Sequence, residues 1–457
     1  MAKNACGIMV GILLFVAGGA AAPAPLVVHE WGTFTSFQDE QGRTISRINV
    51  DDEPVPSFVH RQGPLPILQT TALPALWSKG KGAPRCYPGV TMRLETPVIY
   101  FYPPAGWQST PFDVSATFRG GWLTEFYPAA TSGGMENALL DGSARGSLQW
   151  HQVQLDPALS WRLHDTDSSV WNAPRKVSAT VVSTQERDEA EKFLFYRGIG
   201  NVSAPIRVGQ RNGMLQFSLR DGEKLDALPR LWLFEVQPDG GVQLATLDGT
   251  GRELEAPALT AAAPGDKSGL VELRRQLKEA LVAQGLFDDE AEAMLETWKL
   301  SYFDSPGLRL FFLLPQAWTD ARLPLSISTP AKITRVMVGR IELVSPRQRA
   351  TLRKIYALKN AAAFPAKPLY IENPQALGAW HQGDLTLSGM YRAVDRPVPK
   401  SLELYESLGR FRDALLAHEM ELATDAAQRG RLMRVLYNYG TCDGDVRVSE
   451  PVQTTQR

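Results

Sequence analysis

The stretch at residues 27–37, which reads VVHEWGTFTSF, constrains the fold more than any other part of the chain. Its threonines and aromatic residues favour the pleated surface of a β-strand. Because side chains alternate along a strand, His29 and Trp31 fall on one face while Glu30 and Phe34 fall on the other. We expect this strand to organise a sheet, and we expect its leading ionisable pair to share a pocket with polar groups from distant parts of the chain.

Further strand patterns follow at short intervals through the first half of the chain. Apolar, aromatic or β-branched runs predict strands at residues 95–103, 112–119, 122–127, 147–155, 177–184, 206–208, 214–219, 231–237 and 242–247. Asp239, Gly240 and Gly241, between the last two, are typical of a hairpin turn. Many short strands separated by turn residues indicate a β-sandwich or a pair of sandwiches.

The pattern changes after residue 255. Residues 256–267 are rich in Ala, Pro and Gly, which predicts a linker. Beyond them, Leu270, Leu273 and Leu277 recur at helical spacing. Other helices are predicted at 346–358 and 401–437, and strands at 309–314, 323–328 and 333–344. The sequence therefore predicts a β-rich α+β fold, with a β-sandwich-like region at 23–255 and a mixed helix and strand region at 268–457 that ends in helices.

The first 22 residues have the features of a secretory signal peptide. Lys3 supplies a positive start, residues 7–20 form an apolar core, and the small residues at 18–22 are typical of a cleavage site. The apolar run is shorter than the roughly 20 residues that span a bilayer. We expect a mature chain without a transmembrane segment, located in the periplasm or outside the cell.

Charge and length narrow the classes of function and architecture. Lys and Arg number 48 against 49 Asp and Glu, so the chain carries no basic footprint for nucleic acid. A chain of 457 residues exceeds one comfortable hydrophobic core, which favours two or more domains.

Two cysteines, Cys86 and Cys442, remain after the predicted cleavage. In an oxidising compartment an even pair predicts a disulfide, which here would tie an early loop to the C-terminus. The alternative is two unrelated buried thiols. Zinc binding by either cysteine is disfavoured, because neither has a second cysteine or a histidine at ligand spacing.

Four sequence blocks carry a resemblance to known proteins. They are VHEWGTFTS at 28–36, ETPVIYFY at 95–102, KFLFYRGIGN at 192–201 and RVMVGRIELVSP at 335–346. With these blocks the chain resembles a group of exported bacterial proteins whose activity is uncharacterised. The resemblance implies export and a shared fold, and it implies no reaction, cofactor or catalytic residue.

Standard catalytic signatures are missing from the sequence. His29 and Glu30 are not followed by a histidine at Thr33, so they do not form a helical zinc-protease motif. A dispersed site for a divalent metal, zinc or a similar ion, would use His29, Glu30 and His60, with His151 or His164 as a further nitrogen ligand. The alternative is that His29 only forms a hydrogen bond within a sheet. Asp165 and Asp167, in the run RLHDTDS, are candidate calcium ligands.

A second candidate site is a pair of carboxylates. Glu95 and Glu125 lie on aromatic strands, and two acids about 5–10 Å apart are what glycoside cleavage requires. Trp31, Trp122 and Trp161 are candidate platforms for a ligand such as a sugar ring. The alternative is that the glutamates are structural and that the tryptophans fill hydrophobic cores.

Three functional classes stay open at this point. We favour slightly an envelope or extracellular protein that binds a ligand or polymer, with carbohydrate as one such ligand, because no catalytic constellation is visible. The alternative is a metal-assisted or carboxylate-based hydrolase with its site around His29, Glu30 and Glu95, with Glu125 as a further acid. A purely structural envelope protein would need neither site.

Overall fold

One large mixed sheet runs through the molecule and joins strands from both halves of the chain. The computed structural model describes residues 24–50, 53–62, 83, 85–108, 110–135, 139–184, 189–223, 225–260, 262–358, 386–393 and 395–440. The main path of the sheet has the order β14-β13-β16-β18-β1-β3-β10-β5-β7-β4-β17, and β2, β6, β8 and β9 attach to it. The β-rich α+β class predicted from the sequence is confirmed.

The strands of this sheet come from three stretches of the chain. The first stretch gives β1 (Leu26–Gln38), β2 (His60–Arg61), β3 (Met92–Tyr102), β4 (Phe112–Arg119), β5 (Gly121–Tyr127), β6 (Thr131–Gly133) and β7 (Arg145–Leu155). The second gives β8 (Val182–Thr184), β9 (Glu189–Glu191), β10 (Leu194–Gly200), β13 (Leu231–Val236) and β14 (Val242–Leu247). The third gives β16 (Gly307–Leu314), β17 (Leu325–Ile327) and β18 (Ala331–Leu343). A small second sheet contains β11 (Ile206–Arg211), β12 (Met214–Leu219) and β15 (Glu253–Pro257).

The strand β1 lies at the centre of the main sheet, as its sequence predicts. It pairs in parallel with β18 on one side and antiparallel with β3 on the other. Twelve of its 13 residues are buried, because both faces of the sheet are covered at this point. Strands on both sides of the predicted linker at 256–267 therefore share one sheet, since β18 lies between β16 and β1.

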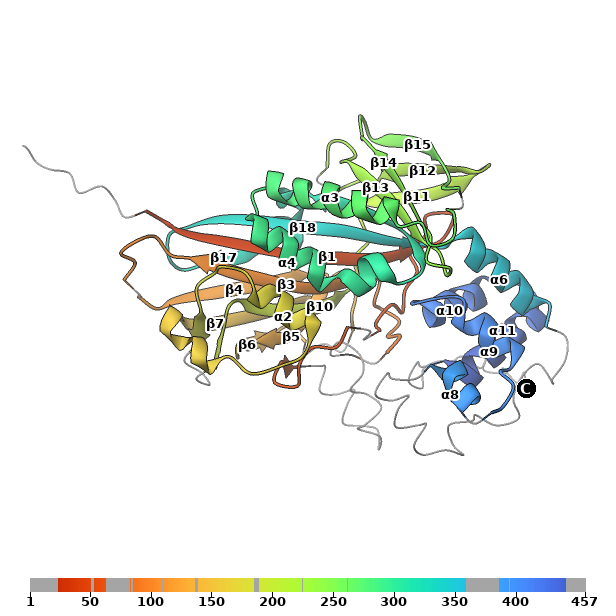
Figure 1. Cartoon of the computed structure of the whole chain (residues 1–457), viewed down its shortest axis with the longest axis horizontal. Coiled ribbons are helices and arrows are strands. Elements are labelled where there is room, and N and C mark those ends of the chain that lie inside the picture. Colours follow the sequence, from red (N-terminus) through yellow and green to blue (C-terminus); the bar gives the residue numbers. More distant parts are fainter. Residues whose placement is uncertain are drawn as a thin grey trace, which may run out of the picture.

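Different elements cover the two faces of β1. On one face, Val28 and Phe34 pack in a hydrophobic cluster with residues of β4 and β7 and of the small sheet. On the other face, Trp31 packs in a cluster with the helices α2 (Ser169–Arg175), α3 (Ser268–Ala283) and α4 (Asp288–Thr297). Figure 1 shows α3 and α4 lying along the strands β1 and β18.

The described helices that follow β18 in the sequence gather at one end of the strands (Figure 1). They are α6 (Pro346–Tyr356), α8 (Leu387–Ala393), α9 (Lys400–Glu406), α10 (Arg412–Leu422) and α11 (Ala426–Tyr439). Their apolar residues form a cluster with Phe37, Trp122 and Ile199 from the strands. This C-terminal helical region therefore packs on the ends of β1, β5 and β10.

Some predicted elements differ from the structure in extent. The helix predicted at 401–437 is three helices, because Gly409 takes a left-handed backbone with φ of 86° and Asp425 caps a new helix through its side chain. Short elements without a long periodic pattern were not predicted: the 3-10 helix η2 (Pro157–Arg162), α2, α5 (Gln316–Arg322) and β9.

Among the residues that the structure describes, no helix combines the length and the apolar character needed to cross a bilayer. The predicted signal peptide at 1–22 and the predicted disulfide partner Cys442 lie outside the described residues. Cys86 is buried. The bond between Cys86 and Cys442 therefore stays a prediction.

Candidate functional site

A line of polar side chains crosses five neighbouring strands of the main sheet at one level. Thr33 on β1 lies opposite Glu95 on β3, and Arg197 on β10 lies opposite Glu125 on β5. Glu125 in turn lies opposite Arg61 on β2. We call these five residues the polar row. Its first four members are 0 % exposed, whereas the side chain of Arg61 is 38 % exposed, so the row runs from the core to the surface.

The backbone is irregular along the polar row. The register shifts between Trp31 and Thr33 on β1, and again between Arg197 and Gly198 on β10. Next to Glu95, Thr96 has a φ of 40°, which is an outlier for a β-branched residue. β-Bulges and strained backbones cluster at functional sites, where they re-aim side chains. Arg197 lies beside Thr96, since its Nε donates to the hydroxyl of Thr96 at 3.1 Å.

Three arginines lie around Glu95: one is two residues away on the same strand, and two come from distant parts of the chain. Oε1 of Glu95 lies 3.3 Å from Nε of Arg93, 3.4 Å from Nη2 of Arg340 and 3.9 Å from Nη2 of Arg410. Closed hydrogen-bonded ion pairs have N···O distances of about 2.7–2.9 Å. These contacts of the three guanidinium groups with the Glu95 carboxylate are longer than this, although Arg93 and Arg340 both donate hydrogen bonds to it at 3.4 Å.

Two other buried glutamates, Glu125 and Glu53, also lie near arginine side chains. Glu125 lies 3.2 Å from Arg61 and 3.5 Å from Arg197, and Glu53 lies 3.8 Å from Arg410. Glu53 also accepts from the backbone N–H of Ser301 at 3.2 Å. Carboxylate and guanidinium groups thus alternate through the interior of the molecule.

An aromatic side chain borders the polar row on the helical side. Tyr302 belongs to the π-helix η3 (Lys299–Asp304), and its hydroxyl forms a hydrogen bond with the hydroxyl of Thr33. The guanidinium carbon of Arg340 lies 5.4 Å from the centre of the Tyr302 ring, in a cation–π contact. π-Helical turns are rare and occur frequently at functional sites.

Arg340 is buried within this group of charged side chains and has unsatisfied donors. Its side chain is 0 % exposed, and no described residue provides a hydrogen-bond partner for its Nη1. Burial lowers the pKa of Arg340, and the nearby Arg410 lowers it further. An additional negative charge beside Arg340 would offset both effects. The chemistry of this position therefore favours an acidic group as a neighbour.

The structure does not place His29 and Glu30 in a common pocket. The side chain of His29 points to the helical face, where Nδ1 lies 2.8 Å from Oε2 of Glu290 on α4. Glu30 points to the opposite face and pairs with Arg335 at 2.5 Å and with the hydroxyl of Tyr196. The expectation of a shared pocket is wrong, because adjacent residues of a strand face opposite sides.

Glu290, the partner of His29, is itself held by further hydrogen bonds. It accepts from the hydroxyl of Tyr102 at 2.8 Å and from the backbone N–H of Phe287 at 2.6 Å, so it also caps the start of α4. His29 thus anchors α4 to the sheet through a buried carboxylate.

The structure does not assemble the predicted metal site. His60 pairs with Glu189 at 2.8 Å, and His164 is exposed and stacks on Phe58 at 4.8 Å. Within the described part of the chain, no group of three or more His, Cys, Asp and Glu side chains could hold a metal ion. Asp165 and Asp167, the candidate calcium ligands, are exposed on the loop before α2.

The three candidate ligand-binding tryptophans lie apart from one another. Trp31 and Trp122 are fully buried in two different hydrophobic clusters. Trp161 is 75 % exposed and packs only with Arg162 in a cation–π contact at 5.1 Å. The structure does not gather these tryptophans on one face.

The polar row brings together two of the three glutamates predicted as catalytic, Glu95 and Glu125, and leaves Glu30 on the other face. The arginines were missed, because an isolated arginine in a strand pattern is usually assigned to solvent. A usable signal existed: Thr33, Glu95, Arg197 and Arg340 each lie in one of the four sequence blocks given above.

A scan of protein-family models and a search of curated proteins found no match to this chain.

Proposed function

We propose that the protein is an exported binding protein for an acidic carbohydrate, and that the polar row contacts the sugar. A single observation carries the proposal: Arg340 is buried beside Glu95 of the row, and its Nη1 has no hydrogen-bond partner among the described residues. A carboxylate only accepts hydrogen bonds and a guanidinium only donates them, whereas a sugar hydroxyl does both. A hydroxyl group is therefore suited to lie between a glutamate and a neighbouring arginine of the row.

The acidic character of the ligand is proposed from the charge around Arg340. Arg340 and Arg410 both lie within 4 Å of Glu95, and repulsion between them contributes to the lowered pKa of Arg340. A uronic acid carboxylate beside Arg340 would supply the missing hydrogen-bond acceptor for Nη1. A neutral sugar would leave that donor buried and unsatisfied, which costs about 1–3 kcal/mol.

The test is a titration of the mature protein with a panel of acidic and neutral oligosaccharides, followed by calorimetry. We expect an acidic oligosaccharide to bind more tightly than its neutral counterpart, by about tenfold for one charge-assisted hydrogen bond. Arg61→Ala, at the exposed end of the row, should weaken that binding about tenfold. Arg230→Ala, which removes a surface pair with Asp248, is the matched control and should leave it unchanged.

Two results would contradict the proposal. One is a panel in which no acidic oligosaccharide binds at all. The other is an acidic oligosaccharide whose affinity is the same for Arg61→Ala, Arg230→Ala and the unmodified protein, since binding would then take place away from the polar row.

Hydrolysis by the same row is the second candidate function. Glu95 and Glu125 lie two strands apart, which corresponds to about 10 Å, close to the separation of about 6.5–9.5 Å in inverting glycosidases. The arginines around both carboxylates favour binding over catalysis. Incubation of the bound oligosaccharide with the protein distinguishes the two: shorter products that disappear in Glu125→Gln would establish a hydrolase, and an intact ligand would exclude one.

Export of the chain is part of the proposal. Cleavage after Ala20 or Ala21 would remove the predicted signal, and oxidation would join Cys86 to Cys442. Intact-mass measurement of the protein from a periplasmic fraction should give a chain lacking 20 or 21 residues, lighter by two hydrogens than its reduced form. A full-length, fully reduced chain in the cytoplasm would disprove this part of the proposal.

A further inference from the structure

A separate pocket opens on the other side of the main sheet. It has a volume of about 250 Å³ and is lined by Arg119, Gly142, Arg145, Gly222, Glu223, Trp318, Ala321 and Arg322. The lining residues come from the end of β4, the start of β7, the turn after β12 and the helix α5. Trp318 packs edge-on against Phe34, which lies on the face of β1 opposite the polar row. The pocket and the polar row are therefore independent sites.

Positive charge dominates the lining of this pocket. Three guanidinium groups face one carboxylate, a formal surplus of two positive charges. Glu223 is engaged on both oxygens: it accepts from Nε1 of Trp318 at 2.6 Å and from Nη2 of Arg322 at 3.0 Å. Glu223 therefore holds Arg322 in place, and its single negative charge does not neutralise the other two arginines of the pocket.

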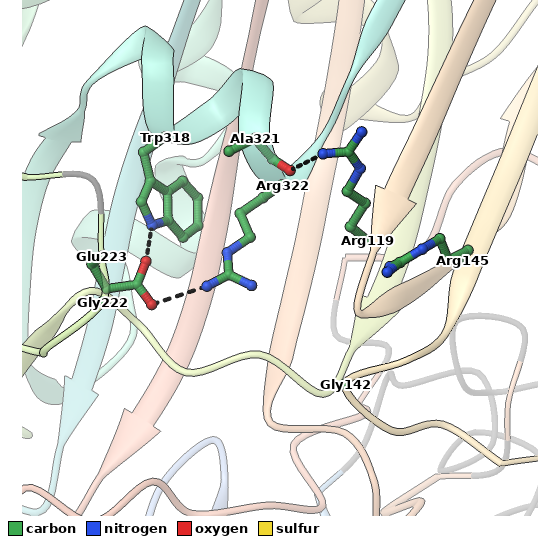
Figure 2. Close-up of a pocket in the computed structure, with 8 residues that line it drawn as sticks. All are labelled: Arg119, Gly142, Arg145, Gly222, Glu223, Trp318, Ala321 and Arg322. Carbon is green, nitrogen blue, oxygen red and sulfur yellow. Dashed lines mark hydrogen bonds and ion pairs between the residues drawn. The ribbon is translucent and has the colours of Figure 1, made fainter.

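Arg119 and Arg145 have only backbone partners among the described residues. Nη1 of Arg119 donates to the carbonyl of Ala321 at 3.3 Å, and Nη1 of Arg145 donates to the carbonyl of Ala144 at 3.5 Å. Figure 2 shows the guanidinium groups of Arg145 and Arg322 pointing toward each other across the pocket, with Arg119 beside Ala321. Most of their N–H groups are thus available to a ligand in the hollow.

We propose that this pocket binds a tetrahedral oxyanion, either free phosphate or sulfate or the terminal phosphate or sulfate of a small ester. Arginine forks match the oxygens of such groups in pairs. Three forks from three different elements fit an anion with three or four oxygens in different directions, whereas one fork already satisfies a planar carboxylate. A cavity of about 250 Å³ is below the range of roughly 300–1,000 Å³ that holds drug-sized ligands. It therefore fits a small ion or the end of a larger molecule.

The test is a calorimetric titration at constant ionic strength with sodium phosphate, sodium sulfate and glucose 6-phosphate. Equal affinity for phosphate and glucose 6-phosphate would identify a site for the free ion. Tighter binding of glucose 6-phosphate would identify a site for a terminal ester. The absence of millimolar or tighter binding by all three would overturn the proposal.

Variants assign the binding to this pocket. Arg145→Ala should weaken the anion about tenfold or more, because it removes charge-assisted hydrogen bonds without removing a side-chain contact of the fold. Arg211→Ala, an exposed arginine on β11, is the matched control and should leave the affinity unchanged. An equal effect of the two changes would place the anion elsewhere and overturn the proposal.

A third variant separates ligand binding from a merely structural role of the pocket. Glu223→Gln keeps an acceptor for Trp318 but removes the negative charge, so the anion should bind about threefold more tightly. Weaker binding by Glu223→Gln, with an unchanged melting temperature, would contradict the proposed electrostatics. Loss of the polar-row ligand has no bearing on this outcome, since none of these residues belongs to that row.

Discussion

Asp39 follows the last residue of β1 and connects the sheet to the C-terminal helical region. Its side chain is 1 % exposed, and its Oδ2 lies 2.6 Å from Nε of Arg43 and 3.0 Å from Nε2 of His418 on α10. Burial raises the pKa of Asp39, but the hydrogen bonds from His418 and Arg43 outweigh it and lower this pKa from 3.8 to about 2. The ionised carboxylate is therefore favoured by folding.

The lowered pKa of Asp39 predicts a pH-dependent contribution to stability. The contribution is present in full above the ordinary pKa and is lost as pH falls from about 4 to about 2. Asp39→Asn should reduce the free energy of unfolding near neutral pH by about 2 kcal/mol, and this deficit should shrink at acid pH. Urea unfolding at several pH values measures it. Asp248→Asn, an exposed carboxylate, serves as control, and a deficit in Asp39→Asn that does not change with pH would contradict the account.

Some site residues could be identified from the sequence and others could not. Glu95 and Glu125 stood out because carboxylates are unusual on aromatic strands. Arg197 and Arg340 did not stand out, because their partners lie on strands far away in the sequence and pairing at that distance leaves no local signal. The opposite orientation of His29 and Glu30 followed from strand alternation, and the expectation of a common pocket disregarded it.

At the scale of elements, one arginine of α6 connects this helix to two other parts of the molecule. Arg349 binds both carboxylate oxygens of Glu40, at 2.7 and 2.8 Å, and Glu419 on α10 at 2.8 Å. Glu419 also accepts from the hydroxyl of Tyr356. The hydrogen bonds to Glu40 and Glu419 raise the pKa of Arg349, which keeps its charge secure. This residue therefore joins α6, α10 and the loop after β1.

Removal of that connection should loosen the C-terminal helical region. Arg349→Ala should lower the free energy of unfolding by about 2 kcal/mol, because it leaves Glu419 partly buried without its cation. Arg353→Ala, an exposed arginine on the same helix, should change it by less than about 0.5 kcal/mol. Thermal unfolding compares the two variants, with hydrogen exchange of α10 as a local readout. Equal stability of both would show that α6 is held by its apolar face alone.

Elements with strong local patterns were predictable, and those defined by tertiary contacts were not. The strands at 95–103, 112–119 and 231–237 correspond to β3, β4 and β13 within three residues at each end. The division of the predicted C-terminal helix at Gly409 was not predicted. A glycine inside a helical pattern is only a weak stop signal, and here the left-handed backbone decides it.

At the scale of the whole molecule, the central feature is a sheet in which strands about 300 residues apart in the sequence lie side by side. β1 pairs with β18 over 13 residues, from Leu26 with Ala331 to Gln38 with Leu343. Apolar periodicity predicts strands but not which strands pair across 300 residues, so the sequence indicated separate regions where the structure has one continuous sheet. The polar row exists only because of this assembly, since its members and their arginine partners come from β1, β2, β3, β5, β10, β18 and the helical region.

The polar row as a ligand-contacting surface is the central claim, and a crystal structure of the mature protein with its tightest-binding acidic oligosaccharide tests it most directly. The account predicts sugar hydroxyls within hydrogen-bond distance of Glu95 and Arg197, and the acid group beside Nη1 of Arg340. An oligosaccharide bound elsewhere on the molecule, with the arginines still encircling Glu95 as they do without ligand, would contradict it.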